Sequence, residues 1–129
     1  MPSRGVGLER LGFPPRRRLR RKSDFERVYA RGRRWGDGFF AIIVSANRTG
    51  EARLGLAVAV KTVGSSVERN RIRRVIRETF RLRQHELPGV DLVVSARPQA
   101  RGARNEQLRA SLNTLWDRVI QQCASLPRS

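Results

Sequence analysis

The sequence predicts one small α+β domain in which helices cover a β-sheet. Three runs of apolar and β-branched residues, at 39–46, 54–60 and 90–96, have the length and composition of strands. Two segments with helical periodicity lie on either side of the last run, one opening at residues 64–66 and one at Asn105. The chain has 129 residues, the size of a single domain.

The first expected element is a short helix over residues 23–31. Ser23 and Glu26 have the spacing of a capping box, in which each side chain bonds a backbone amide at the start of the helix. Gly32 ends the helix. Three residues share its apolar face: Phe25, Val28 and Tyr29. By this periodicity alone, core packing is the favoured interpretation of the two aromatic rings.

The strands come next. The runs at 39–46 and 54–60 are separated by turn-forming residues at 47–50, and together they predict a hairpin of two mostly buried strands. Residues 33–35 are a candidate short strand before them. With the third run at 90–96, the predicted order is α-β-β-α-β-α and contains one strand–helix–strand crossover.

The helix that opens at residues 64–66 has one apolar face and one basic face. The apolar residues lie within an arc of ~140° and predict a buried stripe: Ile72, Val75, Ile76, Thr79 and Phe80. The opposite face is polar and is flanked by Arg73: Asn70, Arg74, Arg77 and Arg81. The last helix has its own apolar stripe: Leu108, Leu112, Leu115, Trp116 and Val119.

The charge of the chain predicts a nucleic-acid partner. Lysine and arginine total 28 against 11 acids, which gives a net charge of +17. Only Lys22 and Lys61 are lysines, so 26 of the cations are arginines. Arginine binds phosphate bidentately and stacks on bases, and an excess of cations of this size is typical of nucleic-acid-binding domains.

The sequence offers no constellation for catalysis by the protein itself. His85 is the only histidine and Cys123 the only cysteine, which excludes an intramolecular disulfide and a multi-cysteine metal site. The acids are dispersed, whereas metal-dependent nucleases cluster carboxylates. We therefore expect no catalytic or metal-binding residue on the protein, and we interpret Cys123 as a small apolar filler.

The longest apolar run falls well short of the ~20 residues of a membrane span, and no signal peptide is evident. The expectation is a soluble cytoplasmic protein.

The basic helix is the strongest local signal. Five arginines lie between residues 69 and 77 beside the apolar stripe. A solvated helix normally interleaves acids to relieve such repulsion, so the compensating anion is expected on a partner. The alternative is a basic face that is merely solvated.

Residues 61–81 closely resemble the signature of the bacterial ribonuclease P protein subunit. The signature consists of a lysine, a glycine three residues later, Arg-Asn-Arg, a basic pair and a further arginine one turn on. Residues 19–29 resemble the opening of that family and residues 53–60 the strand before its signature helix. The resemblance runs from about Leu19 to Val119.

The resemblance implies an α-β-β-β-α-β-α order, a small mixed sheet and an unusual left-handed crossover, as in a ribosomal-S5-like fold. It also implies a function: the protein binds a large catalytic RNA, which with Mg²⁺ removes the 5′ leader of precursor tRNA. The protein subunit is inactive alone and supplies affinity and substrate choice. Mg²⁺ is expected to bind mainly through the RNA, and no obligate protein partner or membrane is implied.

The resemblance also implies two sets of site residues. The first would contact RNA: Lys61, Arg69, Asn70, Arg71, Arg73, Arg74, Arg77 and Arg81. The second would line a cleft for the leader: Arg20, Lys22, Phe25, Tyr29, Phe39 and Ile43. The family often has an aromatic residue at the position of Ile43, and Phe39, expected on the same strand face, would supply the ring instead.

The predicted organisation is a disordered basic tail at 1–18, one RNA-binding domain at 19–124 and a short tail at 125–129. Two other functions are weighed against the ribonuclease P subunit. A general RNA-binding or ribosome-associated protein would not need the full signature. An autonomous nuclease would need the missing carboxylate cluster.

Overall fold

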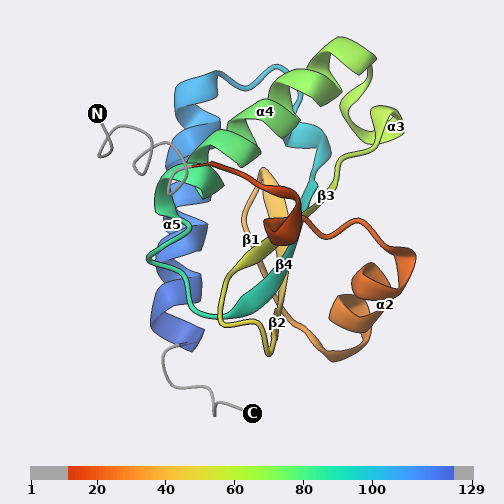
Figure 1. The fold of residues 1–129 in the computed structure, drawn as a ribbon. Helices are drawn as coiled ribbons and strands as arrows, with labels where there is room; N and C mark the ends of the chain where they lie inside the picture. Colours follow the sequence, from red (N-terminus) through yellow and green to blue (C-terminus); the bar gives the residue numbers. More distant parts are fainter. Residues whose placement is uncertain (1–11, 124–129) are drawn as a thin grey trace, which may run out of the picture.

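A computed structural model of the chain describes residues 12–123, which form a four-stranded sheet with helices on both faces (Figure 1). The elements in chain order are η1 (Pro15–Arg17), α2 (Lys22–Arg31), β1 (Arg33–Gly36), β2 (Phe40–Ala46), β3 (Arg53–Ala57), α3 (Val60–Val63), α4 (Ser66–Arg83), β4 (Val90–Ala96), η2 (Pro98–Ala100) and α5 (Asn105–Cys123). The α+β class is therefore confirmed. The candidate strand at residues 33–35 is also confirmed, as β1.

The strand order in the sheet is β1-β2-β4-β3. The predicted hairpin of residues 39–46 and 54–60 is wrong, because β4 lies between β2 and β3, antiparallel to the first and parallel to the second. The first five residues of β4, 90–94, are all buried, which suits a central position covered on both faces. Continuous apolar runs identify strands but do not specify which strands pair.

The predicted strand–helix–strand crossover is present, because α4 connects the parallel neighbours β3 and β4. The second predicted strand is shorter than expected. It ends at Ala57, and the short helix α3 follows from Val60. The left hand of the crossover and the likeness to ribosomal protein S5 stay predictions.

The start of α2 differs from the predicted capping box. The helix begins at Lys22, so that Arg21 is its N-cap and no side chain caps it. Ser23 consequently lies inside the first turn instead of before it. The acid of this turn is Asp24, which is favourably placed at the positive end of the helix dipole.

Residues 13–18, assigned from the sequence to an unstructured tail, have a defined place beside the sheet. Leu19 donates its backbone N–H to the carbonyl of Leu54 at 2.9 Å, and Arg18 forms a parallel bridge with Leu54. Arg17 is buried, and its guanidinium lies 3.4 Å from a carboxylate oxygen of Glu51. The segment thereby covers the exposed edge of β3. The remainder of the predicted tail, residues 1–11, and residues 124–129 lie outside the described range.

Two hydrophobic clusters lie on opposite faces of the sheet. The larger one packs the sheet against α4 and α5 around Phe40, Phe80 and Trp116. The smaller one packs it against α2 and includes Ile43. In Figure 1, α4 and α5 lie side by side, and α2 lies apart from them beyond the sheet. The edge strand β3 therefore lies between α2 and α4.

Candidate nucleic-acid interface

Helix α4 supplies half of the candidate side chains. Ser65 caps it by accepting a hydrogen bond from the backbone N–H of Glu68 at 3.1 Å. Its buried residues are those that the periodicity predicted: Ile72, Val75, Ile76, Thr79 and Phe80. With this stripe packed on the core, the arginines of α4 are divided between two flanks of the helix. One flank faces the N-terminal segment and β3, and the other faces α5.

The first flank forms one wall of a cleft of about 200 Å³. The other walls are β3, the start of α2 and the N-terminal segment. Its lining combines rings, aliphatic side chains and guanidinium groups: Phe13, Arg18, Leu19, Arg20, Phe25, Leu54, Leu56, Arg73 and Arg77. We call this the central cleft. Residues far apart in the sequence thus meet over the edge strand β3.

Phe25 is half-buried in the central cleft. Its ring lies on Gly55 of β3, where a Cβ atom would come within 2.8 Å of the ring. It also packs against the smaller hydrophobic cluster. Phe25 therefore has both properties that the sequence analysis weighed as alternatives, core packing and exposure to the cleft. Tyr29, one turn later, is 42% exposed and is not among the lining residues.

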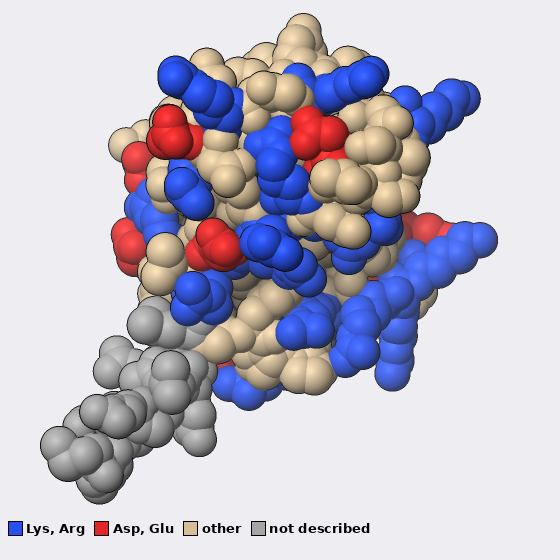
Figure 2. Space-filling model, turned by 90° about the horizontal axis from the view of Figure 1, so that it is seen from above, with Lys and Arg blue, Asp and Glu red and all other residues tan. Residues whose placement is uncertain are grey.

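The cations of the central cleft lack counter-charges within the described residues. Neither Arg73 nor Arg77 forms an ion pair with a carboxylate of residues 12–123. Partial burial lowers the pKa of Arg73, and the neighbouring charges of Arg69 and Arg77 lower it further. Figure 2, seen from above Figure 1, shows basic side chains spread over the surface with few acids between them. Such crowding favours a polyanion as partner.

The three residues of the Arg-Asn-Arg motif, Arg69, Asn70 and Arg71, lie in three different environments. Arg71 turns inward: its guanidinium donates to both carboxylate oxygens of Glu68 at 2.7 and 3.0 Å, and to the Ala103 carbonyl and Asn105 Oδ1 at 2.8 Å each. Arg69 donates its Nε–H to the Val58 carbonyl at 2.9 Å. Arg71 thus ties the first turns of α4 to the start of α5, and its fork of donors is largely used within the protein.

Asn70 and Arg74 lie on the second flank, in a groove of about 470 Å³ between α4 and α5. Arg109 of α5 lines the same groove, and its guanidinium is 3.9 Å from the Glu78 carboxylate. Arg109 could not be predicted from the sequence, because its place beside α4 depends on how the two helices pack. Both Asn70 and Arg74 are exposed, as predicted for a polar face.

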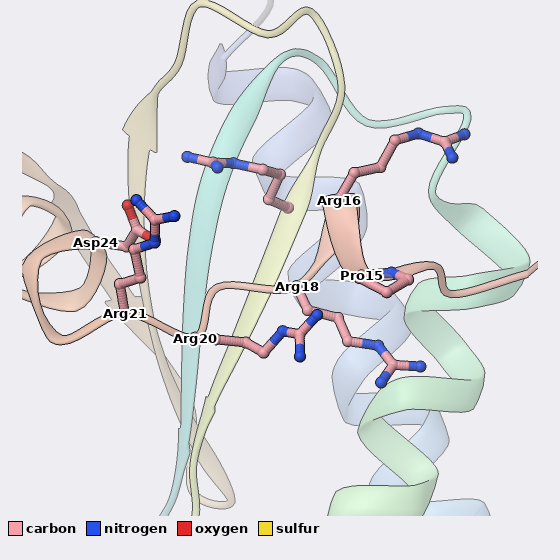
Figure 3. A pocket seen from close by; sticks show the side chains of 7 residues that line it. Pro15, Arg16, Arg18, Arg20, Arg21 and Asp24 are labelled. Carbon is pink, nitrogen blue, oxygen red and sulfur yellow. The ribbon is translucent and has the colours of Figure 1, made fainter.

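A second group of arginines surrounds the N-terminal segment (Figure 3). We call this hollow, of about 550 Å³, the arginine pocket. It is lined by Pro15, Arg16, Arg18, Arg20, Arg21, Asp24 and Arg53. Arg16 and Arg53 are held by the carboxylates of Glu51 and Asp91. Arg18 and Arg20 line both this pocket and the central cleft, so that the two hollows are adjacent. Of these two, only Arg20 is among the residues predicted from the sequence.

Other predicted site residues lie at the margins. Lys61 is exposed on α3, and Arg81 is half-buried near the end of α4. Lys22 is exposed at the start of α2, where its Nζ is 3.9 Å from the Glu26 carboxylate. None of the three lines the central cleft.

The expectation that Phe39 and Ile43 share one strand face is wrong. Phe39 precedes β2 and packs against the larger hydrophobic cluster beside α5. Ile43 is 6% exposed and lies under α2 in the smaller cluster. The extended alternation that would place both on one face does not hold at Phe39, because Asp37 turns the chain there by accepting from the backbone N–H groups of Phe39 and Phe40.

Within residues 12–123, no group of three or more histidine, cysteine, aspartate or glutamate side chains could hold a metal ion. Cys123 is buried, and burial raises the pKa of its thiol, which agrees with a packing role. Across the same residues, no helix is both long enough and apolar enough to span a bilayer.

Known proteins resemble this chain in both sequence and fold. The family model described as Ribonuclease P matches residues 13–120. A "Ribonuclease P protein component" of Thioalkalivibrio sulfidiphilus is 40% identical over 114 residues, which cover 88% of this chain and 95% of the relative. The Escherichia coli O157:H7 component is 43% identical over 111 residues, covering 86% and 93%. The solved Staphylococcus aureus RNase P protein superposes with a TM-score of 0.74 at 29% identity, covering 84% of this chain and 95% of that one.

Proposed function

Because this chain belongs to the ribonuclease P protein family, we propose that its central cleft receives the single-stranded 5′ leader of precursor tRNA. Membership makes the chain a subunit of ribonuclease P, an endoribonuclease of tRNA 5′ processing, and makes the ribonuclease P RNA its partner. The leader and the catalytic RNA would then bind to different surfaces of the protein.

One observation carries the leader assignment. The central cleft places the half-buried ring of Phe25 opposite Arg73 and Arg77, which have no carboxylate partner among residues 12–123. Single-stranded RNA is bound by this combination, because bases stack on aromatic faces while cations follow the backbone. A cleft of about 200 Å³ suits extended nucleotides better than a duplex.

We assign the catalytic RNA to exposed polar and basic side chains on the second flank of α4 and on α3, the short helix that precedes it. Arg74 and Asn70 lie on the flank towards α5, and Lys61 lies on α3. Contacts of this kind to phosphates position an RNA without reading its sequence. Arg71 has a different role in this proposal: it fixes α4 against α5 and so aligns the neighbouring contacts.

The chemistry of cleavage is proposed to reside on the RNA. Mg²⁺ would be held mainly through the catalytic RNA and would supply activation of water and stabilisation of the leaving group. The contribution of the protein is then affinity for the leader and orientation of the substrate. The holoenzyme would act in the cytoplasm.

The test is reconstitution. The purified protein, the cognate catalytic RNA and precursor tRNA are combined at low Mg²⁺ concentration, and 5′ maturation is followed with and without the protein. We expect the protein to raise cleavage and to increase affinity for precursor tRNA over mature tRNA, which lacks a leader. Equal affinity for the two tRNAs would refute leader binding. Cleavage by RNase-treated protein would refute catalysis by the RNA.

A further inference from the structure

The N-terminal segment builds a second planar surface at the mouth of the central cleft. The guanidinium carbon of Arg18 lies 4.8 Å from the centre of the Phe13 ring. Its Nε–H also donates to the Phe13 carbonyl at 2.9 Å. Two independent contacts therefore fix a side chain that would otherwise sample many rotamers.

Phe13 is itself anchored to the core. Its ring meets Phe80 of α4 edge-on, with ring centres 5.5 Å apart, and Phe80 is completely buried. The chain on the other side of Arg18 is fixed by the bond from Leu19 to β3. The platform made by Arg18 on Phe13 is thus supported from both α4 and the sheet.

Arg18 lies between the central cleft and the arginine pocket, because it lines both. Figure 3 shows Arg18 and Arg20 extending from the segment in the same general direction, towards α4, whereas Arg21 lies beside Asp24. Arg18 is exposed and forms no ion pair with a carboxylate of the described residues. One side of its guanidinium rests on Phe13, and the rest of the group is available to a ligand.

We infer that Arg18, stacked on Phe13, is a binding platform for a second nucleobase of the leader, which leaves the central cleft past Phe25. The inference rests on the proposed function and extends it by a site that the sequence analysis did not find. Bases stack on planar guanidinium groups as they do on aromatic rings, and a guanidinium prearranged on a ring loses little freedom when a base arrives. Arg20 and Arg21 then lie near the backbone of the strand as it enters the arginine pocket.

The experiment separates stacking from charge. Arg18→Lys keeps the positive charge and removes the planar group, and the matched control is Arg118→Lys, the same change at an exposed arginine of α5 that lines neither the central cleft nor the arginine pocket. Holoenzymes with each variant are titrated with precursor tRNA, with mature tRNA and with a series of leaders carrying one abasic nucleotide at successive positions.

We expect Arg18→Lys to weaken precursor-tRNA binding about fivefold or more, the lower end of the range for base stacking. Mature tRNA and the dependence of affinity on salt should be unchanged, because the charge remains. At one leader position, the abasic substrate should bind wild type and Arg18→Lys equally. Arg118→Lys should behave as wild type.

Wild-type affinity of Arg18→Lys for every leader would overturn the inference, as would an equal loss at all abasic positions or a loss for mature tRNA. Leader binding itself is tested separately by Phe25→Ala. A loss with Phe25→Ala but none with Arg18→Lys rejects only the second platform. No loss with Phe25→Ala rejects the proposed function.

Discussion

The ring of Phe25 lies directly on Gly55, so close that a Cβ atom at residue 55 would be 2.8 Å from Cζ of the ring and 3.0 Å from Cβ of Leu19. The close approach joins α2 to the edge strand β3. Phe25 shares the lining of the central cleft with Arg73 and Arg77 of α4. The glycine therefore acts on the site by its lack of a side chain.

Gly55→Ala should displace the ring of Phe25 and weaken binding of precursor tRNA while leaving mature tRNA unaffected. Overpacking of this kind typically costs ~1–3 kcal/mol of stability, so the melting temperature should also fall. The matched control is Gly38→Ala, since a Cβ atom there meets nothing within 4 Å. Precursor-tRNA affinity that is unchanged in Gly55→Ala would show that the position of the Phe25 ring does not govern leader binding.

Phe25→Ala tests the ring itself. If the ring stacks on a leader base, the variant should lose ~1–3 kcal/mol of affinity for precursor tRNA, with mature tRNA and the catalytic RNA bound as before. Because Phe25 is only half-buried, its stability loss should be smaller than the ~3–5 kcal/mol of a buried phenylalanine. Melting temperature and both tRNA affinities are measured together. A large drop in melting temperature with equal losses for the two tRNAs would identify Phe25 as a core residue only.

Helix α4 shows which features of a helix its periodicity can predict and which it cannot. All five residues of its predicted apolar stripe are buried. The prediction succeeds because a helix that packs on one core buries the one face on which its apolar residues lie. The same reasoning could not tell Arg71 from Arg74. Both lie outside the stripe, yet Arg71 bonds the start of α5 and Arg74 remains exposed. That difference depends on a neighbour more than 30 residues away.

The sheet and the N-terminal segment were harder to predict for a related reason. The apolar sequence of a buried strand such as β4 does not indicate which strands it pairs with. Proximity in the sequence therefore suggested the wrong pairing for β2 and β3. Phe13 and Arg18 lie among glycine, proline and arginine residues and have no period of their own. Their positions are fixed by contacts with Leu54 and Phe80, and only the folded chain brings these residues together.

The two flanks of α4 predict separable effects on RNA. Arg77 lines the central cleft and Arg74 the groove towards α5. Arg77→Ala should weaken binding of precursor tRNA more than binding of mature tRNA. Arg74→Ala should instead weaken binding of the catalytic RNA. Each variant should flatten the salt dependence of its own complex by about one counterion. Fold stability should change by no more than ~0.5 kcal/mol, since both residues are exposed.

The control for these two variants is Arg118→Ala, which removes an exposed arginine of α5 outside both hollows. It should leave both complexes unchanged. A salt slope for catalytic-RNA binding that Arg74→Ala does not alter would exclude Arg74 as a contact to that RNA.

The network of Glu68 and Arg71 predicts a loss of stability in acid. The hydrogen bonds from Arg71 and from the Gly102 N–H lower the pKa of Glu68 from its ordinary 4.5 to about 2. The ionised carboxylate therefore stabilises the folded protein fully above pH 4.5, and this contribution disappears as the pH falls towards 2. Glu68→Gln should be less stable at neutral pH and should lose less on acidification, as measured by urea unfolding at pH ~7 and ~3.

Arg71→Ala should remove the same pH-dependent contribution and leave the Ala103 carbonyl and Asn105 without their donor. Hydrogen bonds to a charged group contribute roughly 1.5–3 kcal/mol, so a loss of ~2 kcal/mol is expected at neutral pH. Arg71→Lys should recover little of it, because an ammonium cannot reach Glu68 and the start of α5 with one planar fork. If Arg71 instead contacts RNA directly, Arg71→Ala would leave urea stability intact and weaken the RNA complex alone. Comparing unfolding with RNA affinity therefore distinguishes a residue that positions α4 and α5 from one that binds phosphate.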